Sequence, residues 1–309
     1  MKKALYIFLI LLLSVSALCG CGKTAEQTKD GYTFTDDLGR TVTVESCEKT
    51  AALLGSYADI WMLSGGSVCA TADDAWDDFD LPLSEDTVNL GGTKKLSLEK
   101  LFAANPDFVL ASTNTPQHLE WEKNLEDAGI TVAYFDVSDF EDYLRMLKIC
   151  TDITNRPDIC QDYGLSLQNQ ITAILDRNRE KPSQSVLVMR ASAASIRAKN
   201  SDGTLLGKML KEFGCKNIAD DDSTLLENLS IESIMLQNPD KIFFIQSGDD
   251  SDGMKQNIEK MFSESPLWNE LDAVKSGRVY YMDKHLYNLK PNARWAEAYA
   301  NLEEILYAQ

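Results

Sequence analysis

Aromatic, arginine and polar side chains follow several apolar segments of the chain, and these side chains suit the capture of a small molecule. In an open α/β sheet, ligands bind beyond the carboxyl ends of the strands. Rings stack on flat or apolar parts of a ligand, and a guanidinium group pairs with a carboxylate. The candidate ligand-binding residues are Tyr57, Trp61, Asp74, Trp76, Thr113, Arg190, Arg197, Tyr287, Arg294 and Trp295. For each aromatic residue taken alone, packing of a helix against the core is an equally good interpretation.

Sequence signatures of catalysis and of metal binding are absent. The chain has no glycine-rich phosphate loop, no H-E-x-x-H motif and no G-x-S-x-G motif. Segment 97–100 fits S-x-x-K without its companion motifs, so we interpret it as the capped start of a helix. Only two histidines are present, and we expect His118 to be solvated and His285 to be structural. We therefore predict no enzyme activity, no cofactor and no resident metal.

Short apolar segments alternate with helical patterns, which predicts an α/β fold with mainly parallel sheets. The expected strands lie at 51–54, 68–72, 108–111, 131–135, 186–189, 241–245 and 279–282, and a hairpin is expected at 32–44. A mostly helical stretch separates two groups of strands. We predict an N-terminal lobe at 32–145, a long linking helix at 146–182 and a C-terminal lobe at 183–309. The rims of two Rossmann-like lobes would then face each other across a ligand cleft.

An internal repeat supports the division into two lobes. Segment 96–107 (LSLEKLFAANPD) matches segment 229–240 (LSIESIMLQNPD) at a constant offset. In each copy a serine, Ser97 or Ser230, is placed to cap a helix. Glu99 and Glu232 then fall in the first helical turn, where the helix dipole favours negative charge. The Asn-Pro pair ends each helix before the next strand.

The composition excludes several classes of protein. The chain has 309 residues, 48 acidic and 30 basic residues, a formal charge of −18 and 44% hydrophobic residues. Bare nucleic acid is an unsuitable partner, because phosphate contacts need clustered lysine and arginine. The apolar content is too high for a disordered chain, and too few long apolar runs are present for a multispan membrane protein. We expect the exported protein to act as a monomer.

The first residues form a targeting segment. Lys2 and Lys3 precede an apolar run that is short for a membrane-spanning helix and fits the core of a signal peptide. The run ends in Leu18-Cys-Gly-Cys21, which resembles a bacterial lipobox. We predict a signal peptide at 1–20, lipidation of Cys21 and a flexible tether at 21–31. The alternative is an ordinary cleaved signal in which Cys21 is incidental.

The other five cysteines lack C-x-x-C spacing, so a zinc site is not expected. An odd number argues against a complete disulfide framework. Cys150 and Cys160 would bridge only if a turn brings them together, and buried free thiols are the favoured interpretation.

Several of these segments together resemble the class III solute-binding lipoproteins of ABC importers, a family that carries ferric siderophores, heme and cobalamin. The resemblance rests on Asp37-Leu-Gly-Arg40, Asn89-Leu-Gly-Gly92, the two repeats and Ala273-Val-Lys-Ser-Gly-Arg-Val-Tyr280. It implies that Glu99 and Glu232 dock the two lobes onto a permease dimer that works with a cytoplasmic ATPase. It also implies a lipid-anchored protein on the outer face of the cytoplasmic membrane.

The function expected from these features is capture and delivery of a metal chelate, with a ferric siderophore or heme first and a corrinoid next. Two alternatives from other classes remain. One is a surface enzyme on the same scaffold, for which only Asp283 with His285 offers a pair of reactive groups. The other is an accessory lipoprotein without a transported ligand.

Overall fold

The computed structural model describes residues 27–28, 31–263 and 265–307. A small antiparallel sheet comes first, in the order β1-β2-β3, formed by β1 (Gln27–Thr28), β2 (Gly31–Thr35) and β3 (Thr41–Val44). The turn between β2 and β3 is held by Asp36, whose carboxylate accepts hydrogen bonds from the backbone N–H groups of Leu38 and Arg40. Alternate residues of both strands are buried, and the predicted hairpin is confirmed.

The N-terminal lobe is built on a parallel sheet in the order β6-β5-β4-β7-β8. Its strands are β4 (Thr50–Ala52), β5 (Val68–Thr71), β6 (Val88–Asn89), β7 (Phe108–Ser112) and β8 (Thr131–Phe135). Its helices are α2 (Gly55–Leu63), α3 (Asp74–Asp77), α4 (Leu98–Ala104), α5 (Pro116–Glu120) and α6 (Glu122–Asp127). The central strands β4 and β7 are buried on both faces, which explains why they form continuous apolar runs in the sequence.

The C-terminal lobe has a second sheet in the order β10-β9-β12-β13, with β11 also paired to β9. Its strands are β9 (Ser185–Ala191), β10 (Ile196–Lys199), β11 (Lys216–Asn217), β12 (Lys241–Gln246) and β13 (Val279–Met282). Only the pair β9–β10 is antiparallel. The surrounding helices are α10 (Leu205–Glu212), α11 (Ser223–Glu227), α12 (Ile231–Gln237), α13 (Ser251–Ile258), α14 (Pro266–Glu270), α15 (Asp272–Lys275) and α16 (Lys284–Tyr287), with short helical turns at η2 (Ser201–Gly203), η3 (Glu259–Ser263) and η4 (Asn292–Arg294).

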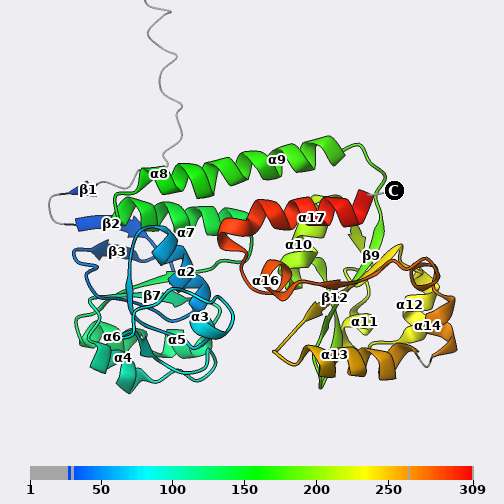
Figure 1. Ribbon diagram of the computed structural model, residues 1–309, viewed down its shortest axis with the longest axis horizontal. Helices are drawn as coiled ribbons and strands as arrows, with labels where there is room; N and C mark the ends of the chain where they lie inside the picture. Colours follow the sequence, from blue (N-terminus) through cyan, green and yellow to red (C-terminus); the bar gives the residue numbers. More distant parts are fainter. Residues whose placement is uncertain (1–26, 29–30, 264, 308–309) are drawn as a thin grey trace, which may run out of the picture.

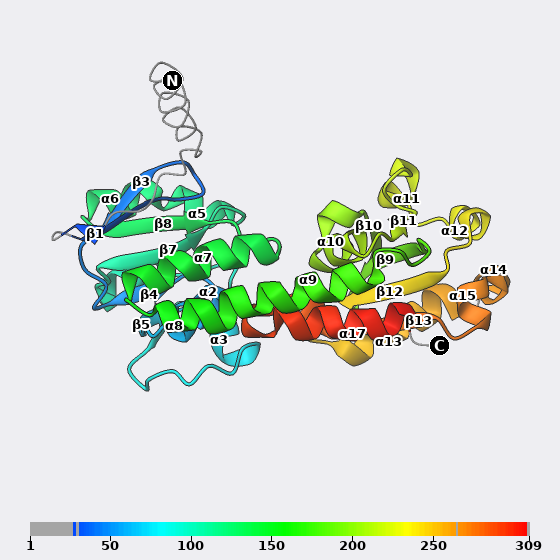
Figure 2. The same cartoon turned by 90° about the horizontal axis from the view of Figure 1, so that it is seen from above.

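Two roughly parallel helical segments join the lobes along one side of the molecule (Figures 1 and 2). One runs without a break through α8 (Pro157–Cys160), the π-helical turn η1 (Gln161–Leu165) and α9 (Ser166–Asn178). The other is α17 (Trp295–Tyr307), which packs along α9. The two-lobe α/β architecture with mainly parallel sheets and a long connecting helix is therefore confirmed.

The connecting helix is shorter than the predicted span 146–182. Helix α7 (Phe140–Ile153) packs on the N-terminal lobe through contacts with α2 and β2. The chain leaves helical geometry at Asn155, which has a positive φ of 56°, just before Pro157. Proline disfavours helical geometry in the residue before it, so a new helix starts at Pro157. Cys150 and Cys160 on either side of this break are both free thiols.

The sequence repeat corresponds to two copies of one helix-to-strand unit. In α4 and α12, Ser97 and Ser230 accept hydrogen bonds from the N–H groups of Lys100 and Ser233, which confirms both caps. The aspartates that end the repeats then fix the first strand of each lobe. Asp107 accepts from the N–H groups of Glu48 and Lys49, and Asp240 accepts from the N–H and hydroxyl of Ser185. Within the described residues, no helix is long and apolar enough to cross a membrane.

Candidate functional site

Two of the predicted ligand contacts in the N-terminal lobe lie in its core. Tyr57 is 0% exposed, and its hydroxyl donates to the carbonyl of Phe135 at 2.8 Å. Trp61 is 1% exposed, packs edge-on against Phe108 and donates from Nε1 to the carbonyl of Ser67 at 3.0 Å. Both side chains attach α2 to the sheet and have no free surface for a ligand, so the contact role predicted for them is corrected to packing.

The same correction applies to two aromatic residues near the C-terminus. Tyr287 is buried, and its hydroxyl donates to the carbonyl of Ala298. Trp295 is 1% exposed and packs against Phe140 and Tyr143 at the start of α7. Because these rings lie where α17 passes α7, they join the connecting helices to the N-terminal lobe. A single sequence cannot separate such packing aromatics from exposed ones at the same distance after a strand.

Three cationic residues gather on one face of the C-terminal sheet. Arg197 on β10 lies directly opposite Arg190 on β9, and Lys199 is two residues further along β10. Ile196 and Ala198 point into the hydrophobic core on the other face of β10, so Arg197 and Lys199 share the face of Arg190. We call Arg190, Arg197 and Lys199 the cationic cluster.

The electrostatics of the cationic cluster are unfavourable for the protein without a partner. Burial lowers the pKa of Arg190, whose buried Nε–H donates no hydrogen bond to any described residue. Burial also lowers the pKa of Lys199, and the guanidinium groups of Arg190 and Arg197 lower it further. In the described part of the chain, no carboxylate forms an ion pair with any of the three. In a chain with a formal charge of −18, an uncompensated cluster of this kind is a natural site for an anionic group.

Polar residues of the N-terminal lobe gather at the carboxyl ends of β5, β7 and β8. Asp74 accepts a hydrogen bond from the N–H of Gly55 at 2.8 Å, and burial raises its pKa to about 6. Thr113 follows β7, and its hydroxyl is buried without a hydrogen-bond partner in the described structure. Asp136 follows β8 and accepts from the side-chain amide of Asn114. Trp76 on α3 is half-buried, so part of its surface is available to a ligand.

The segment after β13 crosses to these N-terminal residues. Lys284 on α16 pairs with Asp78 at 2.5 Å, and only 13% and 19% of the two side chains are exposed. Lys290 is half-buried, with its amine near the ring of Tyr57. Burial lowers its pKa, and the charges of Asp136 and Asp74 raise it. The rim of one lobe is therefore in electrostatic contact with a segment of the other.

Arg294, also predicted to contact ligand, already has a partner. It is exposed, and it forms a two-pronged ion pair with Glu297 at 2.7 Å. Sequence reasoning in turn missed Lys199, Lys284, Lys290 and Asp136. Lys284, Lys290 and Asp136 follow strands, and Lys199 lies on the same strand as Arg197. The search for side chains that follow strands would have found them if it had included lysine and the aspartate after β8.

The two carboxylates predicted to dock onto a partner are both exposed. Glu99 lies in the first turn of α4 and Glu232 in the first turn of α12, one on each lobe. The hydroxyl of the cap Ser230 donates to the carboxylate of Glu232 at 2.9 Å. A hydrogen bond from a backbone N–H and the one from Ser230 both lower the pKa of Glu232.

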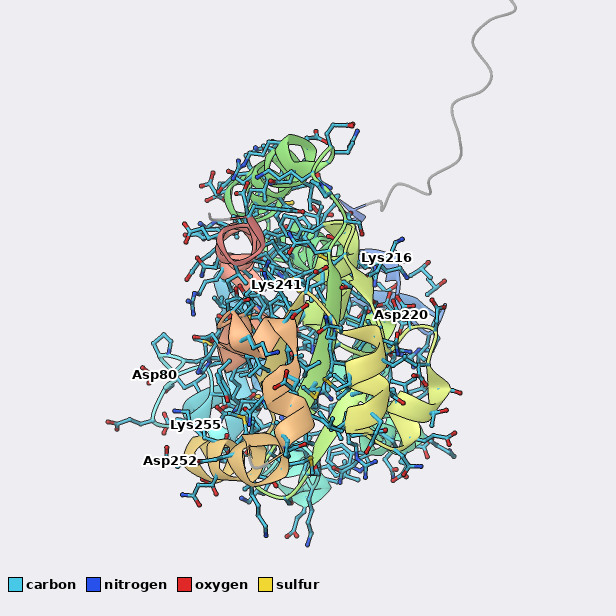
Figure 3. All side chains as sticks on the ribbon, turned by 90° about the vertical axis from the view of Figure 1, so that its right-hand side faces the viewer. Asp80, Lys216, Asp220, Lys241, Asp252 and Lys255 are labelled. Carbon is cyan, nitrogen blue, oxygen red and sulfur yellow. The ribbon has the colours of Figure 1, made fainter. Side chains whose placement is uncertain are left out.

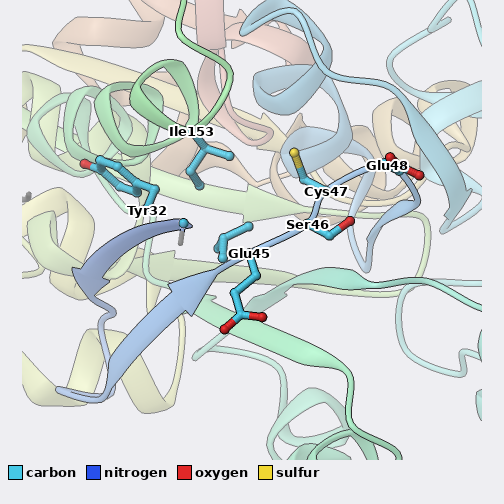
Figure 4. A pocket seen from close by; sticks show the side chains of 8 residues that line it. Tyr32, Glu45, Ser46, Cys47, Glu48 and Ile153 are labelled. Carbon is cyan, nitrogen blue, oxygen red and sulfur yellow. The ribbon is translucent and has the colours of Figure 1, made fainter. Parts of the chain in front are cut away.

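A separate hollow opens on the opposite edge of the N-terminal sheet (Figure 4). It has a volume of about 350 Å³, and Tyr32, Glu45, Cys47 and Ile153 are among the residues that line it. It lies at the amino end of β4, away from the strand ends that carry the candidate site. On the outer end of the C-terminal lobe, Lys216, Asp220, Lys241 and Lys255 are spread over different elements, so charges of both signs are mixed there (Figure 3).

Comparison with known proteins agrees with this architecture. The family model described as "Periplasmic binding protein" matches residues 51–286. An uncharacterized ABC transporter substrate-binding lipoprotein, YvrC of Bacillus subtilis, is 26% identical and covers 99% of this chain and 98% of its own. The Fe(3+)-citrate-binding protein YfmC of B. subtilis is 22% identical over 92% of this chain and 90% of its own. The structure of Staphylococcus aureus IsdE complexed with heme superposes with a TM-score of 0.68 at 16% identity, covering 84% and 98% of the two chains.

Proposed function

The chain belongs to the periplasmic binding protein family, and from this membership we propose that it is the substrate-binding lipoprotein of an ABC importer. The family to which the sequence was assigned by resemblance is confirmed by the match. The related chains are solute-binding proteins, which supports a role in binding without catalysis. We propose that the ligand is an anionic metal chelate, with a ferric siderophore or heme as the leading classes and a corrinoid next.

The observation that supports an anionic ligand is the cationic cluster. Arg190, Arg197 and Lys199 share one face of the C-terminal sheet, and no described carboxylate pairs with them. Citrate in the related iron-citrate protein carries carboxylates, and heme carries two propionates. A single guanidinium group binds a carboxylate through two parallel hydrogen bonds, and this contact is stronger than a hydrogen bond between neutral groups. Ligand carboxylates would also relieve the mutual repulsion within the cluster.

The opposite wall of the proposed cleft is formed by the N-terminal rim. Trp76 offers part of its ring to an apolar or flat portion of a chelate. Thr113 has an unused hydroxyl, and Asp74 is held at the start of α2. We propose that these three residues contact the ligand while the buried Tyr57, Trp61, Tyr287 and Trp295 hold the walls in place. Arg294 would join the site only by leaving Glu297.

Delivery to the membrane completes the proposal. Cys21 lies outside the described residues, and we propose that it carries the lipid that keeps the protein on the outer face of the cytoplasmic membrane. Glu99 and Glu232 present one carboxylate on each lobe, which suits a permease built from two similar subunits. We propose that the protein acts as a monomer and that these carboxylates orient it on the permease.

A binding screen tests the ligand class. Quenching of tryptophan fluorescence would be measured with ferric citrate, further ferric siderophores, heme and cobalamin. We expect an anionic iron chelate to bind, and Arg190→Ala and Arg197→Ala each to weaken binding about tenfold, the factor expected for loss of a hydrogen bond to a charged group. Arg179→Ala is the matched control, because Arg179 is exposed at the end of α9 and pairs with Asp176.

Two outcomes would contradict the proposal. Full affinity in both cleft variants would remove the cationic cluster from the site. Binding of cobalamin with no binding of any anionic iron chelate would overturn the ligand class. Recovery of a chemically altered chelate after incubation would favour the alternative of a surface enzyme.

A further inference from the structure

Helix α12 exposes an unusually large apolar side chain beside its docking carboxylate. Leu236 is 88% exposed, whereas Ile234 two positions earlier is completely buried in the lobe core. Residues four apart lie on the same face of a helix, so Leu236 lies one turn from Glu232 on the outer face. Leu267 on the neighbouring helix α14 is also partly exposed, which extends the apolar surface.

Helix α4 repeats this arrangement on the other lobe. Phe102 is 38% exposed, while Leu101 beside it is completely buried. Phe102 follows Glu99 by three positions, so the ring and the carboxylate also share a face. It borders a hollow of about 390 Å³ whose lining includes Pro106 and Ile130. Both copies of the repeat therefore combine an exposed carboxylate with an exposed apolar side chain.

We infer that Phe102 and Leu236 are apolar anchors of the same docking surface as Glu99 and Glu232, and that the partner is the two-subunit membrane permease. This inference rests on the proposed function. Each permease subunit would supply a basic pocket for the carboxylate and an apolar surface beside it. The carboxylates set orientation, since charged contacts favour specificity, and the apolar side chains supply binding energy through burial.

The presence of one such pair on each lobe indicates the kind of partner. A partner that contacts one lobe alone would not account for the second carboxylate and apolar side chain on the other lobe. A partner with two similar subunits contacts both copies at once, in the manner of a pseudo-symmetric interface. An exposed leucine alone is ordinary on a protein surface. Phe102 aligns with Met235 of the second repeat and Leu236 with Ala103 of the first, so the two apolar side chains are not equivalent positions; each nevertheless lies about one turn after the shared glutamate on the outer face of its helix.

Site-specific photo-cross-linking in living cells tests the inference without knowledge of the ligand. A benzoylphenylalanine would replace Ala103 on α4 or Gln237 on α12, both exposed next to the proposed anchors. We expect adducts with polytopic subunits of an ABC permease, identified by mass spectrometry. Phe102→Ser together with Leu236→Ser should lower their yield about tenfold, the factor expected when a leucine-sized side chain loses its burial. Leu165→Ser on the connecting helix is the matched control.

The outcomes separate this inference from the proposed function. If charge reversal of Glu99 and Glu232 abolishes the adducts while the serine double variant keeps them within about twofold, the apolar anchors are refuted and permease docking stands. Adducts with a partner other than a permease, or no adducts at all, would also overturn the inference. Failure of every chelate to bind in the fluorescence screen would instead count against the proposed function.

Discussion

At the scale of single residues, His118 shows how burial changes the chemistry of a side chain. The sequence predicted a solvated histidine, and this was wrong: His118, which is part of α5, is 0% exposed. Its Nδ1 accepts a hydrogen bond from the N–H of Ser112 at 3.0 Å, and its Nε2 is buried without a partner in the described structure. Burial lowers the pKa of His118 to about 4. The neutral ring thus fixes the end of β7 beside the candidate site.

This histidine should make folding stability depend on pH. At pH values between the ordinary pKa of 6.5 and the lowered pKa of about 4, His118 binds a proton in the unfolded chain but not in the folded chain. The free energy of unfolding must therefore fall as pH falls through this window, by about 3 kcal/mol in total. In His118→Asn, the side-chain oxygen keeps an acceptor for Ser112 but does not titrate. Urea unfolding at pH 7.5 and 4.5 should show a smaller loss in this variant than in the wild type.

The exposed His285 provides the control for this comparison. His285→Asn should leave the pH-dependent loss in place. An equal loss in wild type and His118→Asn would show that other groups control acid stability.

The residue scale is also where the sequence was least informative. Trp61 and Arg190 both follow strands expected from the sequence, at 51–54 and 186–189, yet Trp61 is enclosed by the core and Arg190 carries a guanidinium Nε without a described partner. Their environments depend on helices distant in sequence, such as α7 and α17, which no local pattern specifies. The positions of Glu99 and Glu232 were easier to predict, because a residue in the first turn after a serine cap is exposed in most helices.

At the scale of elements, the ends of the two repeated helices form a matched pair. Asn105 and Asn238 both adopt left-handed geometry, with φ of 51° and 41°, at the carboxyl ends of α4 and α12. Asn238 additionally bonds to α15, since its side-chain amide donates to the carboxylate of Asp272 at 2.7 Å and its side-chain carbonyl accepts from the N–H of Asp272. The side chain of Asn105 has no such partner among the described residues.

This difference predicts opposite tolerance to glycine, the residue best suited to left-handed geometry. Asn105→Gly should change the free energy of unfolding by less than about 0.5 kcal/mol. Asn238→Gly should lower it by about 1–2 kcal/mol, because two hydrogen bonds to α15 are lost. Chemical denaturation of the two variants measures both values. Equal effects would mean that the contact with α15 contributes nothing to stability.

Elements were predicted well where local patterns determine them. The strands at 108–112 and 131–135 appear within a residue of their expected bounds because apolar runs mark them. The connecting helix was predicted too long, because α7 and α9 share an apolar periodicity. The break between them is a local change of backbone geometry at Asn155, just before Pro157. Strand β10 was missed because a short antiparallel strand with alternating charges resembles a loop.

At the scale of the whole molecule, polar contacts made by Lys208, Lys284 and Asn292 hold the lobes together away from the connecting helices. Lys208 on α10 contacts Asp139 at 3.0 Å at the start of α7. Lys284 pairs with Asp78 as described above. Asn292, completely buried, donates its amide to Asp59 at 2.7 Å. These contacts cross from the C-terminal lobe and its following segment to the N-terminal lobe, so they act directly against separation of the rims.

Removal of the Lys208 and Lys284 ion pairs should loosen the lobes in the absence of ligand. In Lys208→Met with Lys284→Met, Asp139 and Asp78 lose their partners on the other lobe and Asp249 loses its pair with Lys284, so the attraction between the lobes is weakened. We expect a larger radius of gyration in small-angle X-ray scattering, because rigid lobes on a connecting helix respond by hinge motion. Lys211→Met is the control, since Lys211 pairs with Asp202 inside the C-terminal lobe. Addition of the anionic chelate should draw the double variant back toward the wild-type value, because a bound anion between the cationic cluster and the N-terminal rim replaces the lost attraction. Identical scattering of wild type and double variant would instead assign the spacing of the lobes to α9 and α17 alone.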